Sequence, residues 1–264
     1  MKQPFAKKSL GQNFLVDNEI IGKIVSSLRL TLEDTVIEIG PGRGALTERL
    51  VESGAKVIAI ELDRHLAPAL RQQFTGNSNF TVLEADALEM DFPELIRDTE
   101  VTKVKLVANL PYYISTPILQ RLSEQRGVFS ALVLMFQREV VERISATPSD
   151  SNRGYLTVLT ESAFVVERLF DVPPTAFEPR PKVWSSVVKL TPKPKTAADE
   201  SQFRKLVSTA FSQKRKTILN NLKVVYPDAE SALIAADVDV RRRAETLTLS
   251  EWMVLHESLS RNAR

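Results

Sequence analysis

The sequence lacks cysteine altogether and has only two histidines, His65 and His256, which lie far apart along the chain. The absence of cysteine excludes disulfides, thiolate nucleophiles and cysteine-ligated metals, and two distant histidines argue against a zinc or iron site. No apolar run approaches the roughly 20 residues that a membrane-spanning helix needs. The basic N-terminus also lacks the apolar segment of a secretory signal. The lack of a membrane-spanning run and of a signal predicts a cytoplasmic protein, and the lack of cysteine and scarcity of histidine predict no bound metal.

A large excess of one charge sign is also missing, because 35 basic residues face 33 acidic ones for a net charge of +2. The distribution along the chain is less even. Residues 180–223 contain eleven lysines and arginines but only two acidic residues, Asp199 and Glu200, and residues 241–243 are three consecutive arginines. Local positive charge is expected where a protein contacts RNA phosphates. A single basic run is equally often only a solvated surface.

Short apolar runs alternate with helix-like stretches through the first half of the chain. The runs at residues 34–39, 56–60, 80–83, 104–108 and 131–135 have the length of strands, and apolar residues at helical spacing lie between them. Parallel strands joined by crossover helices produce this alternation, in a sheet covered on both faces. The pattern predicts an α/β fold with a Rossmann-like sheet.

The pattern changes after residue 152. Residues 157–160, 164–169 and 185–190 are strand-like and predict an antiparallel addition to the parallel sheet. Four prolines within residues 172–182 exclude a regular helix or a central strand there.

A linker-like stretch at residues 191–196 suggests a domain boundary. We expect a catalytic, cofactor-binding domain over residues 1–191 and a small, basic, α-helical RNA-binding domain over residues 192–264. Trp184 and Trp252 are interpreted as packing residues. Helices of the second domain are expected at residues 201–222 and 229–235 and from Ser250, a plausible N-cap, onward.

The first predicted strand ends in a glycine turn, Gly40-Pro41-Gly42-Arg43-Gly44, which lets the backbone approach a ligand closely. Glu61 follows about 20 residues later at a strand end, where its carboxylate can accept hydrogen bonds from both ribose hydroxyls. Asp86, after the third run, can accept from an adenine amino group or simply cap a helix. The glycine spacing also fits NAD, but the compact turn and Asp86 favour S-adenosylmethionine.

The fourth predicted strand leads into Asn109-Leu110-Pro111-Tyr112, a combination suited to methylating a planar amine. The lone pair of the exocyclic amine of adenine is delocalised into the ring, which makes it a poor nucleophile. If Asn109 and a backbone carbonyl accepted both N–H groups, the nitrogen would become tetrahedral and present its lone pair to a sulfonium methyl group. Tyr112 would stack on the flipped base, and catalysis would rest on positioning and desolvation. The alternative is an ordinary turn with Tyr112 in the core.

Further motifs accompany the glycine turn and the segment that starts at Asn109. They are Leu10-Gly11-Gln12-Asn13-Phe14-Leu15, Glu38-Ile39 before the glycine turn, Glu61-Leu62-Asp63, Tyr113-Ile114-Ser115, Val172-Pro173-Pro174 through Phe177 to Pro181-Lys182-Val183, Lys214-Arg215-Lys216-Thr217 and Glu245-Thr246-Leu247-Thr248. With them, nearly the whole chain resembles the small-subunit ribosomal RNA adenine N6,N6-dimethyltransferase family. The lysine-containing run at residues 214–216 departs from a more arginine-rich run in relatives, which bears on RNA affinity and not on chemistry.

The resemblance implies S-adenosyl-L-methionine as cofactor and four methyl transfers to two adjacent adenosines in the 3′-terminal hairpin loop of small-subunit rRNA, within the assembling 30S subunit. Nothing in the sequence suggests an obligate dimer, so we expect a monomer. Tyr112 and Phe177 would sandwich the target base. The implied cofactor-binding residues are Asn13, Leu15, Gly40, Glu61, Asp86 and Asn109. The implied catalytic residues are Asn109, Leu110, Tyr112 and Phe177.

Three alternatives remain open from the sequence. A methyltransferase of large-subunit rRNA would share the Asn-Leu-Pro-Tyr chemistry, although the N-terminal motif and the proline-rich segment favour the small subunit. A non-catalytic RNA-binding or transcription factor on the same scaffold would be suggested by loss of Glu61 or Asn109, and both are present. An NAD-dependent oxidoreductase would need a proton donor beside a hydride site, and none is evident.

Overall fold

The computed structural model describes residues 7, 11–97, 101–195 and 200–262. Leu10 of the N-terminal motif, Thr196 of the expected linker and Asp199 of the basic segment lie outside the described residues. The chain divides into two compact units. The first unit comprises Met1–Val141 and Phe164–Lys193, and the second comprises Glu142–Ala163 and Pro194–Arg264.

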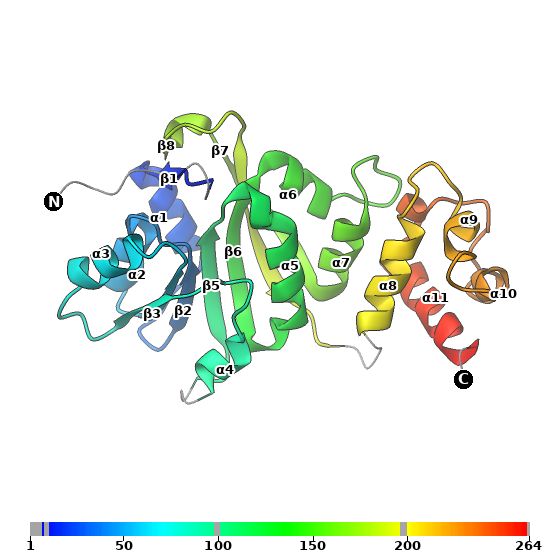
Figure 1. Ribbon diagram of the computed structural model, residues 1–264, viewed down its shortest axis with the longest axis horizontal. Helices are drawn as coiled ribbons and strands as arrows, with labels where there is room; N and C mark the ends of the chain where they lie inside the picture. Colours follow the sequence, from blue (N-terminus) through cyan, green and yellow to red (C-terminus); the bar gives the residue numbers. More distant parts are fainter. Residues whose placement is uncertain (1–6, 8–10, 98–100, 196–199, 263–264) are drawn as a thin grey trace. The chain divides into compact units, whose positions relative to one another are not determined.

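The first unit is built on a seven-stranded sheet (Figure 1). Its strands are β2 (Thr35–Ile39), β3 (Lys56–Glu61), β4 (Phe80–Glu84), β5 (Val104–Asn109), β6 (Phe129–Gln137), β7 (Phe164–Val172) and β9 (Ser185–Pro192). Their order is β4-β3-β2-β5-β6-β9-β7. The first five run parallel, and β9 pairs antiparallel with both β6 and β7. This arrangement confirms the predicted α/β sheet with an antiparallel pair added to parallel strands.

Burial on both faces explains why the central strands read as continuous apolar runs. All five residues of β2 are buried, and so are the last five of β3. A strand covered on both faces has no solvent side that would require alternating polar residues. The helices of this unit are α1 (Asn18–Ser27), α2 (Ala45–Glu52), α3 (Leu66–Gln73), α4 (Phe92–Ile96), α5 (Ser115–Glu124) and, ending beyond Val141, α6 (Arg138–Ile144).

A small second sheet joins two segments that are far apart in the sequence. In it β1 (Phe14–Leu15) pairs antiparallel with β8 (Phe177–Glu178), with Leu15 opposite Phe177, and Figure 1 shows the two strands side by side. The Val16 amide adds a hydrogen bond to the Ala176 carbonyl at 2.9 Å. This pairing anchors the N-terminal segment to the proline-rich segment.

The second unit is helical. It contains α7 (Tyr155–Ala163), α8 (Glu200–Ala210), α9 (Ile218–Leu222), α10 (Ala229–Ala235) and α11 (Leu249–Asn262). Fully buried Trp252 belongs to its apolar core, which agrees with its interpretation as a packing residue. The buried Arg153 guanidinium donates to the carbonyls of Ala146 and Leu247 and to Glu161, so it ties the helices to their connecting loops.

Three expectations about this part of the chain are wrong. Residues 157–160 are not a strand but the middle of α7, because a short apolar run cannot distinguish a buried helix from a strand by periodicity alone. Residues 142–163 therefore pack with the C-terminal helices, and the boundary is not a single cut at 191/192. The predicted helix at 201–222 is interrupted between Ala210 and Ile218.

Two further details differ at single residues. Helix α11 begins one residue before Ser250, and its N-cap interactions come from Thr248, which exchanges hydrogen bonds with Glu251 as in a capping box. Trp184 is not a core residue, because 45% of it is exposed.

Among the described residues, no helix is long and apolar enough to span a membrane.

Candidate active site

A cavity of about 450 Å³ lies at the carboxyl ends of the parallel strands of the first unit. It is lined by residues that follow β2, β3, β4 and β5, and by the N-terminal segment from Gly11 to Val16. Ligands of open α/β sheets bind at this edge, beside the strand from which the connections diverge in opposite directions. Here that strand is β2, which lies between β3 and β5.

The glycine turn after β2 has the backbone that its sequence predicts. Gly40, Gly42 and Gly44 have φ angles of +67°, +61° and +84°, which lie in the left-handed region that favours glycine. Gly42 also has little room for a side chain, because a Cβ there would lie 3.0 Å from the Phe14 ring. The turn leads directly into α2, with Gly44 as its N-cap residue.

Glu61 closes this turn from the neighbouring strand. One carboxylate oxygen accepts the Gly42 N–H at 3.0 Å and the other accepts the Asp63 N–H at 2.9 Å. The residue is only 5% exposed, and burial raises the pKa of its carboxyl group. Each oxygen keeps a second lone pair, so the carboxylate can still accept hydrogen bonds from a vicinal diol.

A second carboxyl group, Glu38, lies deeper in the cavity wall. It is 1% exposed, and its side chain accepts a hydrogen bond from the Thr47 hydroxyl at 2.6 Å. Burial, opposed by that hydrogen bond and reinforced by the charge of Glu61, raises the Glu38 pKa from its ordinary 4.5 to about 8. A pKa of about 8 keeps Glu38 largely protonated at neutral pH, so its carboxylate forms there only when a nearby positive charge stabilises it.

Asp86 lines the cavity but does not cap a helix. Its carboxylate accepts the Leu88 N–H at 2.9 Å within a turn, and the next helix, α4, is capped by Asp91 instead. The turn fixes the carboxylate at the edge of the cavity after β4. The arrangement is compatible with the predicted role of Asp86 as an acceptor for an amino group.

Asn109 is held at the end of β5 by the N-terminal segment. Its side-chain amide nitrogen donates to the Asn13 carbonyl at 3.3 Å. In that orientation the amide uses a donor on the protein and keeps its oxygen as an acceptor for a ligand. Both Asn13 and Asn109 line the cavity, as do Leu15, Gly40 and Leu110.

Tyr112 also lines the cavity, and its hydroxyl is held by a residue of another strand of the same sheet. Its hydroxyl lies 3.0 Å from the hydroxyl of fully buried Ser185, the first residue of β9. Burial raises the Tyr112 pKa, so the phenol stays protonated and can donate in this pair. The half-buried ring thus has a fixed position from which one face can meet a planar ligand.

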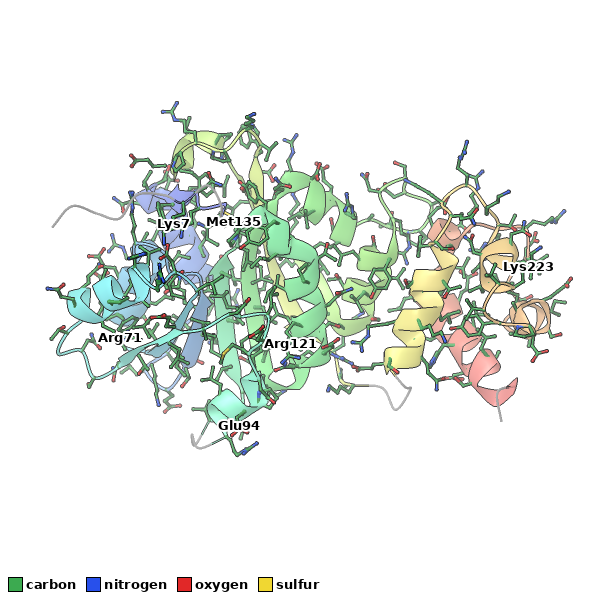
Figure 2. All side chains as sticks on the ribbon, in the orientation of Figure 1. Lys7, Arg71, Glu94, Arg121, Met135 and Lys223 are labelled. Carbon is green, nitrogen blue, oxygen red and sulfur yellow. The ribbon has the colours of Figure 1, made fainter. Side chains whose placement is uncertain are left out.

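Asp63 ties the N-terminal wall of the cavity to β3. It accepts from the Lys7 ammonium at 2.7 Å and from the Gln12 amide at 3.3 Å, and it accepts the His65 N–H as well. Lys7 is labelled in Figure 2 beside the N-terminal strand. These bonds lower the Asp63 pKa against the opposing effect of burial. On the same wall, the Arg43 guanidinium lies 4.3 Å from the centroid of the Phe14 ring.

Phe177 is the one predicted site residue that the structure does not bring to the cavity. Its side chain is 3% exposed and belongs to the apolar cluster that contains Leu15 and residues of α1, α2 and β2. A sandwich of the target base between Tyr112 and Phe177 would require the ring to leave this cluster.

The sequence did not single out three residues that position the site. Ser185 was visible only as the start of a strand, and Arg43 only as a member of the glycine turn. Asp63 belonged to a recognised motif, but a strand-end acid gives no indication that its partners are Lys7 and Gln12, about 50 residues earlier.

Comparison with known proteins matches residues 5–261 to the family described as ribosomal RNA adenine dimethylase. The ribosomal RNA small subunit methyltransferase A of Saccharophagus degradans is 45% identical over 96% of this chain and 94% of its own. The protein of the same name from Hahella chejuensis is 43% identical over 94% and 90%.

Two solved structures are also similar. A dimethyladenosine transferase from Plasmodium falciparum has a TM-score of 0.82 at 29% identity, covering 95% of this chain and 98% of that one. The 23S rRNA methyltransferase ErmE has a TM-score of 0.70 at 27% identity, covering 94% and 100%.

The buried Glu38 predicts a pH-dependent stability. In the folded protein its pKa is about 8 instead of the ordinary 4.5, so between these values the folded state holds a proton that the unfolded state has lost. The stability contributed by the protonated group is complete below pH 4.5 and is lost as the pH rises to about 8. Glu38→Gln keeps the acceptor for Thr47 and removes the titration. Denaturant unfolding of both proteins across this window should show the variant gaining relative stability by at most about 1.4 kcal/mol per pH unit.

Exposed Glu48 on α2 offers a matched control, since Glu48→Gln should follow the wild-type curve. If the Glu38→Gln and wild-type curves ran parallel from pH 4.5 to 8, Glu38 would not be the buried acid described here.

Proposed function

The chain belongs to the ribosomal RNA adenine dimethylase family, and from that premise we propose that it dimethylates N6 of two adjacent adenosines in the 3′-terminal hairpin loop of small-subunit rRNA. Adenine dimethylation of rRNA is the activity of the family. The choice of the small subunit is supported by the names of the two curated relatives. The enzyme acts as a monomer in the cytoplasm, on rRNA within an assembling 30S subunit.

The cofactor of this proposal is S-adenosylmethionine, and the cavity fits it. Its sulfonium supplies an electrophilic methyl group. Glu61 accepts from the ribose hydroxyls, Asp86 from the adenine amine, and the wall formed by Gly40, Asn13 and Leu15 encloses the amino-acid end. The buried Glu61 carboxylate favours this cationic group over NAD, whose pyrophosphate is anionic.

The observation that carries the proposed chemistry is the hydrogen bond from Asn109 to the Asn13 carbonyl. It directs the Asn109 oxygen towards a ligand, where it can accept one N–H of the target amine. The Leu110 carbonyl is the proposed second acceptor. With both N–H groups accepted, the nitrogen lone pair is withdrawn from the ring and exposed for in-line attack, while Tyr112 stacks on the base.

In this proposal Phe177 supports the cavity wall without lining the cavity. It packs in one cluster with Leu15, its partner across the β1–β8 pairing. Its ring therefore supports β1, the strand that carries Leu15. The next residue, Val16, belongs to the cavity wall. The sandwich implied by the family resemblance would instead make Phe177 a contact of the target base.

The test of substrate is methyl transfer to purified, under-methylated small subunits with labelled S-adenosylmethionine. We expect up to four methyl groups per subunit, mapped by nuclease digestion to two adjacent adenosines near the 3′ end of the rRNA. Large subunits and Asn109→Ala enzyme serve as controls. Label in large-subunit rRNA, as the similarity to the 23S rRNA methyltransferase would allow, would contradict the choice of subunit.

Substitutions at Asn109 and Glu61 should separate chemistry from cofactor binding. Asn109→Ala should reduce methyl transfer by about 10²-fold or more, as loss of a polar group at a reacting atom does elsewhere, and should weaken cofactor binding much less than it slows transfer. Glu61→Gln should weaken cofactor binding by about 10- to 100-fold, because an amide cannot accept both backbone N–H groups and two hydroxyls.

Calorimetric titration with S-adenosylmethionine and single-turnover methylation measure these two quantities. Exposed Glu89, beyond the Asp86 turn, provides a control in Glu89→Gln. Normal methylation by Asn109→Ala would remove the basis of the proposed mechanism.

Phe177→Ala should lower stability by about 3–5 kcal/mol, the usual cost of emptying a buried phenylalanine site. We expect it to weaken cofactor binding and methyl transfer together, since the Leu15 strand loses its support. Phe177→Leu should recover most of both. Full cofactor affinity in a folded Phe177→Ala protein that no longer methylates RNA would favour direct stacking on the target base.

A further inference from the structure

An exposed segment of seven residues, Glu178 to Trp184, connects β8 to β9 at the site. We call it the rim segment. Its residues are exposed except Pro181, which is partly buried. Trp184 is 45% exposed, and neighbouring Val183 is 43% exposed. The large apolar ring of Trp184 stays in contact with water beside the site, where it is available to bind a ligand.

Both ends of the rim segment are fixed to the active site. Glu178 lines the cavity at one end. At the other end Ser185, the residue after Trp184, holds the Tyr112 hydroxyl at 3.0 Å. The Trp184 carbonyl also accepts the Arg138 N–H at 2.9 Å, which fixes its backbone to the start of α6. Trp184 is the residue before Ser185, and consecutive Cα atoms are about 3.8 Å apart. Its backbone therefore lies beside the residue whose hydroxyl orients Tyr112, the proposed stacking ring.

The charge of the rim segment suits a polyanion. Arg180 and Lys182 are exposed, and neither makes an ion pair or side-chain hydrogen bond with another described residue. The only acid of the segment, Glu178, lies 4.0 Å from Arg43. Two cations without acidic partners beside an exposed indole combine the two elements of a single-stranded nucleic-acid site, phosphate attraction and a stacking surface.

We propose that Trp184 stacks on a base that flanks the target adenosine, while Arg180 and Lys182 contact the adjoining phosphates. This inference rests on the proposed function, because it assigns a second contact to the same RNA. Extruding one base from a loop leaves its neighbours without a stacking partner. The indole replaces that partner at the entrance of the site, so the flanking base helps to hold the loop open for transfer.

Intrinsic fluorescence gives a direct test, because the chain has two tryptophans and Trp252 is fully buried in the second unit. The difference between wild-type and Trp184→Phe emission reports Trp184 alone. Titration with an RNA hairpin that has two adjacent adenosines in its loop should quench this component. A fully paired RNA of equal length should not, since it offers no unstacked base.

Binding and kinetics supply the second readout. Trp184→Ala should weaken binding of the hairpin and raise KM for small subunits by about 5- to 100-fold, the range of one lost base–aromatic stack. Trp184→Phe should restore most of the loss, and cofactor affinity should not change. Arg180→Gln and Lys182→Gln should each lower the salt dependence of binding by about one unit of slope. Val165→Ala removes an apolar side chain that is 56% exposed on β7 and should have no effect.

The results separate this inference from the proposed function. If wild-type enzyme methylates small-subunit rRNA while RNA leaves Trp184 emission unchanged and Trp184→Ala keeps its KM, the inference is overturned and the function stands. A Trp184 response to ribosomal proteins but not to protein-free RNA would also overturn it. If Trp184 responds to the hairpin but no adenosine is methylated, the stacking surface stands and the proposed function fails.

Discussion

The hydrogen bond from the Asn109 amide to the Asn13 carbonyl links the two halves of the site. Asn109 lies at the end of a buried strand, whereas Asn13 belongs to a segment that must be brought over the sheet edge. The pairing of β1 with β8 and the bonds from Lys7 and Gln12 to Asp63 hold that segment in place. An asparagine left to itself would present either its donor or its acceptor to the cavity. Here the backbone selects the acceptor, and the chemistry of an amine substrate requires that choice.

Electrostatics follows from the same arrangement. Glu61 closes the glycine turn, yet burial raises the pKa of its carboxyl group, and Glu38 beside it is largely protonated at neutral pH because its pKa is about 8. A cationic ligand in the cavity would favour the ionised forms of both groups. The Glu61 carboxylate opposes entry of an anionic dinucleotide. The glycine spacing alone left this choice open, and the carboxyl groups around the turn argue for the sulfonium compound.

The sequence was most informative where chemistry and local backbone coincide. The glycine turn, Glu61, Asp86 and the segment starting at Asn109 lie where the sequence predicted, at or shortly after the ends of β2, β3, β4 and β5. The sequence was least informative where a residue's interaction partner lies far along the chain, or where a short run lacks a readable period. The apolar run in α7 has no polar face from which to read a helical period, and nothing local reveals that Ser185 holds Tyr112. The start of α11 is a different case, because the Thr-x-x-Glu pattern at Thr248 is a local signal and forms a capping box there.

Dimethylation places a demand on this geometry that a single methylation does not. In the proposed mechanism the unmodified amine donates one N–H to Asn109 and the other to the Leu110 carbonyl. After the first transfer only one N–H remains, and the new methyl group must occupy the place of the other. The second transfer therefore proceeds with one acceptor unused, so the lone pair is less strongly withdrawn from the ring. What remains constant between the two steps is the position of the base, which depends on rigid contacts to its faces. If Tyr112 stacks on the base as proposed, its hydroxyl contact with Ser185 on a second strand is suited to keep that position through both transfers.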